Sequence, residues 1–305
     1  MAEFSIIDSY FNRTRLDSVD LGVGDDSALL TPPPHQQLVI CADTLVAGRH
    51  FPLDTHPHAI GWKCVAVNLS DIAAMGAKPQ SILLALSLPQ IDHDWLQAFS
   101  QGLYACCDQF GVSLIGGDTT QSPHLTLSVT ALGWIDQGQA VTRSGAKVGD
   151  LICVSGTVGD AAFALEHLGH PLQHRLDYPT PRCELGQVLK GLASSMIDVS
   201  DGLAQDLGHI LKASKVGATL ELKQLPLSES LQSLPDEQKW QYALAGGDDY
   251  ELCFTISPQN YATLLQNNSY TPTTIIGQIQ PEFGLRLQKD GIDHALHVHG
   301  YQHFA

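Results

Sequence analysis

Short apolar runs that lead into an aspartate recur along this chain of 305 residues, and helical patterns alternate with them. The run QLVICAD (37–43) predicts a buried strand that ends at Asp43. A second run, VSLIGGDTT (112–120), predicts a strand that enters a glycine pair and is closed by Asp118. In MIDVSDGL (196–203) an apolar run passes through two acids into a helix. This alternation favours an α/β fold over an all-helical or all-strand fold.

Two helices are expected in the first half of the chain. The first begins near Pro57 and extends to residue 77, and one of its faces combines apolar residues with an acid: Ile60, Cys64, Val67 and Asp71. The second runs from Asp92, a capping residue, to Gly111. Beyond it, residues 124–134 alternate between apolar and polar side chains, which predicts a strand with one exposed face.

The polar, turn-rich segment 141–150 separates two halves of similar size, so we expect domains at 1–145 and 146–305. The second half repeats the theme of the first. Its segment YALAGGDDYELCFTI (242–256) predicts another glycine-pair-and-acid element, placed between two strands. The likeness of IGGDTT to AGGDDY hints at an internal duplication.

Charge and composition exclude several classes of function. The chain has 32 acidic and 16 basic residues, a formal charge of −16, which disfavours binding to nucleic acid or anionic lipid. Its longest apolar runs, such as ILLALSL (82–88), are too short to span a bilayer, and its first residues lack the basic region of a signal peptide. Seven cysteines without a CxxC pair support neither a disulfide framework nor a zinc ribbon. We therefore expect a cytoplasmic protein.

The acids themselves carry the clearest chemical signal. Each of them alone is most simply a turn former or a helix cap. Together, carboxylates that converge from several strand and helix ends repel one another unless hard cations such as Mg²⁺ hold them. The set comprises Asp25, Asp26, Asp43, Asp71, Asp118, Asp198, Asp201, Asp248 and Asp249.

The sequence offers few other groups for binding phosphate. The glycine pairs Gly116-Gly117 and Gly246-Gly247 allow close approach of the backbone to a phosphate, or serve as tight turns. Arg143, in TRSG, is a candidate phosphate ligand, although a lone loop arginine is more often solvated. The P-loop, GxGxxG and protein-kinase motifs of nucleotide-binding proteins are absent. Neither GxSxG nor a papain-like cysteine motif occurs, so covalent catalysis is not indicated.

Histidines are a weaker signal. The tail HALHVHGYQHFA (294–305) has no accompanying Cys or carboxylate framework, and we reject it as a metal site. His50 in GRHF is the better functional candidate, against the simpler alternative of a structural hydrogen bond in a loop.

The motifs taken in order resemble the thiamine-monophosphate kinase family over nearly the whole chain. They are GVGDDSALL, CADTLVAGRHF, VNLSDIAAMGA, LIGGDTT, VTRSGAK, IDVSDGL, GGDDYELCF and the terminal GYQHFA. The resemblance implies an aminoimidazole-ribonucleotide-synthetase-like fold, with an N-terminal α/β domain that binds ATP and Mg²⁺ and dimerises through its sheet. It also implies a C-terminal α/β domain that completes the nucleotide and substrate site.

The resemblance further implies ATP-dependent phosphorylation of thiamine monophosphate to thiamine diphosphate, and it assigns the site residues. Mg²⁺ ions would be held by Asp26, Cys41, Ala42, Asp43, Asp71, Asp118, Asp198 and Asp201. ATP would contact Gly117, Asp118, Arg143 and Ser200. Thiamine monophosphate would contact His50, Asp248 and Tyr301.

The chain departs from the family pattern at two places. Cys41 and Ala42 stand where the family usually has hydroxyl residues, which leaves only their backbone carbonyls as ligands. Asp248 stands where the family usually has glutamate, one methylene longer. The acceptor in such a reaction is a phosphate oxygen that is already ionised near neutral pH, so alignment and charge neutralisation suffice without a strong general base.

Other functions use similar carboxylates. The nearest alternative is another ATP-using enzyme of the same fold, such as aminoimidazole ribonucleotide synthetase or selenophosphate synthetase. The latter family has a reactive Cys or selenocysteine near its N-terminus, whereas the first cysteine here is Cys41, in a predicted strand. A Mg²⁺-dependent phosphohydrolase and a noncatalytic nucleotide or Ca²⁺ sensor are alternatives of other classes.

Overall fold

The computed structural model describes residues 3–13, 19–267, 271–296 and 300. The chain divides into two compact units, one made of residues 1–72 and 77–138 and the other of 73–76 and 139–305. The first unit ends a few residues before the boundary expected near 145. No described helix is both long enough and apolar enough to cross a bilayer.

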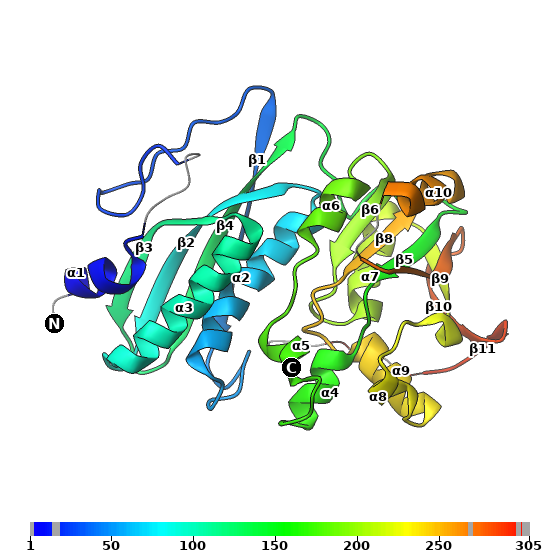
Figure 1. The fold of residues 1–305 in the computed structure, drawn as a ribbon. Coiled ribbons are helices and arrows are strands. Elements are labelled where there is room, and N and C mark those ends of the chain that lie inside the picture. The colour runs from blue at the N-terminus through cyan, green and yellow to red at the C-terminus, as the bar shows by residue number, and fades with distance from the viewer. Residues whose placement is uncertain (1–2, 14–18, 268–270, 297–299, 301–305) are drawn as a thin grey trace. The chain divides into compact units, whose positions relative to one another are not determined.

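The first unit is a four-stranded sheet with helices on one face (Figure 1). Its strands are β1 (Gln36–Val46), β2 (Lys78–Leu88), β3 (Ser113–Gln121) and β4 (Thr126–Asp136), in the order β1-β4-β2-β3. Strand β4 is antiparallel to both β1 and β2, and β2 is parallel to β3. The helices are α2 (Pro57–Ala74) and α3 (His93–Phe110), preceded by the short turns α1 (Glu3–Ile6) and η1 (Ile7–Phe11).

The expected caps and the one-sided burial of this sheet are confirmed. The Trp95 N–H donates to Asp92 Oδ1 at the start of α3, and Gly111 ends the helix at φ 64°. Along β4 buried and part-exposed residues alternate, so one face of the sheet is packed and the other is not. The prediction that Asp43 and Asp118 end their strands is wrong. The β1–β4 ladder continues to Val46, and β3 continues to Gln121.

The second unit contains a seven-stranded mixed sheet in the order β11-β10-β7-β9-β5-β8-β6. Its strands are β5 (Leu151–Ser155), β6 (Ala193–Asp198), β7 (Gly217–Glu221), β8 (Leu252–Ile256), β9 (Thr273–Gln280), β10 (Gly284–Lys289) and β11 (Ile292–Asp293). Its helices are α4 (Asp160–Glu166), α5 (Gln173–Asp177), α6 (Cys183–Leu189), α7 (Leu203–Ser214), α8 (Glu229–Gln232), α9 (Asp236–Ala245) and α10 (Pro258–Asn267), with the turn η2 (Leu222–Gln224).

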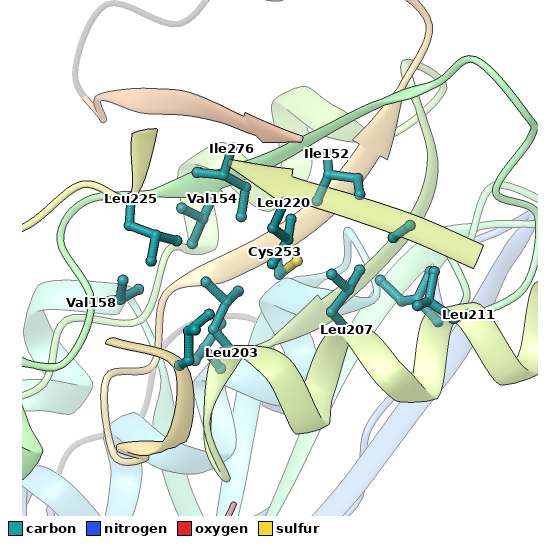
Figure 2. Close-up of a cluster of buried hydrophobic side chains, with 14 of the residues drawn as sticks. Ile152, Val154, Val158, Leu203, Leu207, Leu211, Leu220, Leu225, Cys253 and Ile276 are labelled. Atoms are coloured by element: carbon teal, nitrogen blue, oxygen red, sulfur yellow. The ribbon is translucent and has the colours of Figure 1, made fainter. Parts of the chain in front are cut away.

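The core of the second unit lies between α7 and the sheet. Leu203, Leu207 and Leu211 recur every four residues and point from α7 toward strand residues such as Ile152 and Leu220 (Figure 2). This packing places the start of α7, and the acids before it, at the end of β6. The prediction of two strands around the second glycine pair is half wrong. Residues before the pair form α9, and only β8 after it is a strand.

Candidate functional site

In the first unit, β1 and α2 bring Cys41, Asp43 and Asp71 together through Asn68. The Asn68 side chain is 1% exposed, and its Oδ1 accepts the Asp43 N–H at 3.0 Å. Its Nδ2 donates to the Cys64 carbonyl, one turn back along α2. The sequence analysis did not single out Asn68. The sequence feature that could have identified Asn68 is a polar amide within a mainly apolar helical stretch, three residues before Asp71.

The Cys41 thiol lies beside both carboxylates. Burial raises the pKa of this thiol, and the nearby charges of Asp71 and Asp43 raise it further, so Cys41 stays a neutral thiol. Its Sγ donates to the Asn68 carbonyl at 3.3 Å. Backbone groups of successive strand residues point to opposite sides. Because the Asp43 N–H faces Asn68, the Cys41 carbonyl faces the open edge of β1 and the Ala42 carbonyl faces β4.

Asp118 lies apart from this cluster. Across the sheet, Asp118 pairs with Ala85, Ala85 pairs with Ser128, and Ser128 pairs with Thr44. Thr44 is the residue after Asp43 in β1. Because side chains of successive strand residues point to opposite faces, Asp43 and Asp118 point to opposite faces of the sheet. The two strands that intervene between β1 and β3 also separate them, by about 14 Å at ordinary strand spacing. Within one copy of the chain, a single ion therefore cannot contact both.

The neighbouring Gly117 is required by the sheet. A Cβ on this residue would lie 1.8 Å from the Leu84 carbonyl oxygen, and φ is +149°. Close backbone approach to a phosphate was one expected use of this glycine. The structure shows close approach to strand β2.

The segments around Asp26 and His50 are both turns. Asp25 Oδ1 accepts the Asp26 N–H at 2.8 Å, as expected for a turn-supporting acid, and Asp26 is exposed. At the end of β1, the Val46 N–H donates to His50 Nδ1 at 3.0 Å. Since a backbone N–H can only donate, Nδ1 is the acceptor of this bond. The ring N–H of a neutral His50 is therefore at Nε2 and not at Nδ1.

In the second unit, Asp206 organises the loop between β6 and α7. Its Oδ2 accepts the N–H groups of Ser200, Asp201 and Gly202 at 3.0 to 3.1 Å. Burial raises the pKa of Asp206 to about 7, the charge of Asp198 adds to the rise, and the N–H donors oppose it. Sequence reasoning did not assign Asp206, although an acid in the first turn of a helix is a recognised signal.

The second glycine-pair segment lies against this loop. The Asp248 N–H donates to the Ser200 carbonyl, and the Tyr250 N–H donates to the Val199 carbonyl, both at 2.9 Å. Gly247 permits the approach, because a Cβ there would lie 2.2 Å from the Ser200 oxygen. The structure therefore places Asp248 beside the loop that carries Asp198, Ser200 and Asp201.

Arg143, a predicted ATP contact, lies near the other end of α7 from this cluster. Arg143 accepts a hydrogen bond from Ser214, at the last residue of α7, whereas Ser200 precedes the first turn of that helix. Tyr301, a predicted contact of thiamine monophosphate, lies outside the described residues, as do 297–299 of the histidine-rich tail.

Carboxylates are the donor type that Mg²⁺ prefers. The pKa of Asp206 is raised mainly by burial, and the charges of Asp198 and Asp201 add to the rise. Within the described ranges, no three or more His, Cys, Asp or Glu residues form a group that could hold a metal ion. The predicted ligands are also divided between the two units, Asp43 and Asp71 in one and Asp198 and Asp201 in the other.

Comparison with known proteins covers both units. Residues 24–135 match the AIR synthase related protein N-terminal domain, and residues 147–290 match the C-terminal domain of the same family. The thiamine-monophosphate kinase of Escherichia coli K12 is 46% identical over 99% of this chain and 98% of its own length. The crystal structure of the kinase from Stenotrophomonas maltophilia is 47% identical, with a TM-score of 0.84 over 91% of this chain and 93% of that one.

A structure of AaThiL complexed with AMPPCP and TMP is 30% identical, with a TM-score of 0.79 over 90% of this chain and 89% of that one. The mixed sheets with helices, the order of the acidic motifs and these whole-length matches agree with one another. The chain belongs to the AIR synthase related proteins and, among them, to the thiamine-monophosphate kinase family.

Proposed function

We propose that this protein transfers the γ-phosphoryl group of ATP to thiamine monophosphate, giving thiamine diphosphate and ADP. The observation that carries the proposal is the match to thiamine-monophosphate kinases over 99% of the chain. It is supported by the neighbouring structure of AaThiL with an ATP analogue and TMP. An acidic protein with few basic site residues suits this reaction only if cations accompany the phosphates.

The reaction needs little covalent chemistry from the protein. A phosphate oxygen of the acceptor attacks the γ-phosphorus, the bond from that phosphorus to the β,γ-bridging oxygen breaks, and ADP leaves. The acceptor oxygen is ionised near neutral pH, so no residue has to remove its proton. The task of the chain is to align two anionic substrates and to exclude water between them.

The Mg²⁺ assignment is part of the same proposal. Asp43, Asp71, Asp198 and Asp201 are proposed ligands, and so are Asp26 and the Cys41 carbonyl. Asp118 is proposed for a separate ion, and the Ala42 carbonyl is the weakest candidate because it faces β4. The bound ions would neutralise phosphate charge and offset repulsion between the substrates.

The remaining contacts follow the chemistry of the groups. Ser200, Gly117 and Arg143 are proposed for ATP, while His50, Asp248 and Tyr301 are proposed for thiamine monophosphate. In its neutral form His50 donates through Nε2, which suits a phosphate oxygen. Asp248 suits the cationic part of thiamine. We place this activity in the cytoplasm.

We also propose that the protein is a homodimer joined through the uncovered face of the β1–β4–β2–β3 sheet. Leu38 and Ile40 of β1 are 42% and 58% exposed, and they align with Trp134 and Leu132 of β4. Alternate residues of β4 on the other face are buried under the helices. An exposed apolar sheet face of this kind favours association with a second copy.

The decisive experiment incubates the protein with ATP, Mg²⁺ and either thiamine monophosphate or free thiamine, followed by chromatography of the thiamine products. We expect thiamine diphosphate from the monophosphate alone. Release of phosphate without dependence on an acceptor would instead identify a phosphohydrolase. Nucleotide binding without turnover would identify a sensor.

A further inference from the structure

Glu251, three residues after Asp248, forms a buried ionic cluster with Arg175 and Arg182. None of these three residues has a role in the proposed reaction. Glu251 is 0% exposed, and its carboxylate accepts hydrogen bonds from three elements of the second unit. Arg175 Nη2, from α5, donates to Oε1 at 2.7 Å, and Arg182 Nε, at the start of α6, donates to Oε2 at 2.7 Å. A second Arg182 nitrogen and the Ser155 hydroxyl at the end of β5 complete the set.

Just before Glu251, the backbone adopts a conformation that is rare for residues other than glycine. Asp248 has φ 70° and Tyr250 has φ 52°, both in the left-handed region. Between and after them, the side chains of Asp249 and Glu251 are 1% and 0% exposed. Two residues with a strained backbone, Asp248 and Tyr250, thus alternate with two residues whose side chains are buried, Asp249 and Glu251. Such a conformation persists only where its surroundings determine it.

Glu251 also fixes the segment against the β6–α7 loop. Its carbonyl accepts the Val199 N–H at 2.8 Å, and the next bonds in the same ladder are Tyr250 to Val199 and Asp248 to Ser200. The two arginines hold the Glu251 carboxylate, and Glu251 makes the first hydrogen bond of this ladder. The position of Glu251 therefore determines the position of the residues that form the rest of the ladder. Asp248, the proposed contact of thiamine monophosphate, is at the far end of this ladder.

Stability alone is a poor reason for such a cluster, because a buried ion pair is often no more stabilising than apolar residues of equal volume. Directional pairing, in contrast, specifies one conformation. We propose that Glu251, clamped by Arg175 and Arg182, is a positioning residue that holds Asp248 in place for the acceptor substrate. This inference rests on the proposed function and on the proposed contact of Asp248 with thiamine monophosphate.

The test is the steady-state kinetics of Glu251→Gln, which keeps the shape of the side chain and removes the charge that holds both arginines. We expect the KM for thiamine monophosphate to rise by about 10- to 100-fold, since misplacement of a binding group by about 1 Å has effects of this size. The KM for ATP should rise much less than the acceptor KM, because the proposed ATP contact Ser200 is also held by Asp206 Oδ2. Arg182→Lys, which keeps the charge and loses the two-point contact, should show a smaller rise.

A double variant separates positioning from general damage. In an Asp248→Asn background, Glu251→Gln should add little further increase in the acceptor KM, because both changes act through one side chain. The matched control is Asp150→Asn. This acid is 5% exposed in the same unit and accepts hydrogen bonds from Lys147 N–H and the Ser194 hydroxyl. It should lower the unfolding midpoint without changing either KM.

Equal increases in both KM values, an unchanged acceptor KM in a folded Glu251→Gln protein, or full additivity with Asp248→Asn would overturn the inference. If Glu251→Gln does not fold, Arg182→Lys decides by the same criteria. Lack of turnover by the wild-type protein would overturn the proposed function and this inference with it. Normal turnover with unchanged variants would overturn the inference alone.

Discussion

Asn68 illustrates how one side chain determines the arrangement of the acids in the first unit. It is buried on α2, bonds back to the Cys64 carbonyl and holds the Asp43 N–H at the open edge of β1. A backbone donor at a sheet edge otherwise turns to water. Here the bond to Asn68 fixes the strand beside α2, where Asp71 and the Cys41 thiol lie. The two acids are therefore positioned by α2 and by the edge of β1.

At this scale we expect Asp43→Asn to lower kcat by about 100-fold or more, as loss of a preorganised charge-stabilising group does in other enzymes. The amide keeps the size of the side chain, so the fold should be unchanged. Coupled measurement of ADP release gives kcat, and circular dichroism checks the fold.

Asp136→Asn is the matched control. Asp136 is an exposed acid at the last residue of β4 in the same sheet, and it accepts a bond from the Gln36 side chain. Its replacement should leave kcat within about twofold, as surface changes away from a site usually do. Near-wild-type activity of Asp43→Asn would remove Asp43 from the proposed ligands.

At the scale of elements, the acid-rich segments are held by hydrogen bonds from neighbouring backbone. Asp206 binds three N–H groups before α7, and Asp249 accepts the Gly159 N–H at 2.7 Å, just before α4. Both carboxylates are buried and thus fix loops rather than contact solvent. Asp201 and Asp248 beside them are half-buried, and the Asp201 carboxylate accepts a hydrogen bond from the Gln205 side chain.

Asp249 provides a pH prediction for this element. Burial raises its pKa well above the ordinary value, Asp160 and Glu251 add to the rise, and the Gly159 N–H and Arg175 oppose it. The folded chain then holds this proton more tightly than the unfolded chain. Its contribution to stability is full below the unfolded pKa of about 4 and is lost as the pH rises through the folded value.

The measurement compares urea unfolding of the wild type and Asp249→Asn between about pH 5 and pH 8. The amide retains an acceptor for Gly159 and carries no charge. We expect the unfolding free energy of the wild type to fall with pH relative to that of the variant. Parallel profiles for the two proteins would show that Asp249 has an ordinary pKa.

At the scale of the whole molecule, the uncovered sheet face of the first unit is the proposed dimer interface. We expect Ile40→Asp to convert the proposed homodimer to monomer, because a charge cannot be buried unpaired in an apolar interface. Light scattering after gel filtration gives the mass. Leu53→Asp is the control, since Leu53 is 82% exposed outside the sheet and its replacement should leave the mass unchanged. A wild type that is already monomeric, or an Ile40→Asp variant that stays dimeric, would contradict this interface.

The amino-acid sequence determined the class of fold, the caps of α3 and the acids available to bind cations. These depend on local spacing and on residue type, which the chain states directly. Family membership followed for the same reason, since motif order is a property of the sequence alone. The strand ends at Asp43 and Asp118 were misplaced because ladder length depends on the partner strand.

Only the tertiary structure decided how the acids are arranged. In the tertiary structure, two strands lie between those of Asp43 and Asp118, and the two side chains point to opposite faces of the sheet. Asp248 and Ser200, about fifty residues apart in sequence, are joined by a hydrogen bond. The tertiary structure also exposed the roles of Asn68, Asp206 and Glu251, which look like ordinary polar residues in the chain. Burial and hydrogen-bond partners give a polar side chain its role, and both arise from contacts between residues distant in sequence.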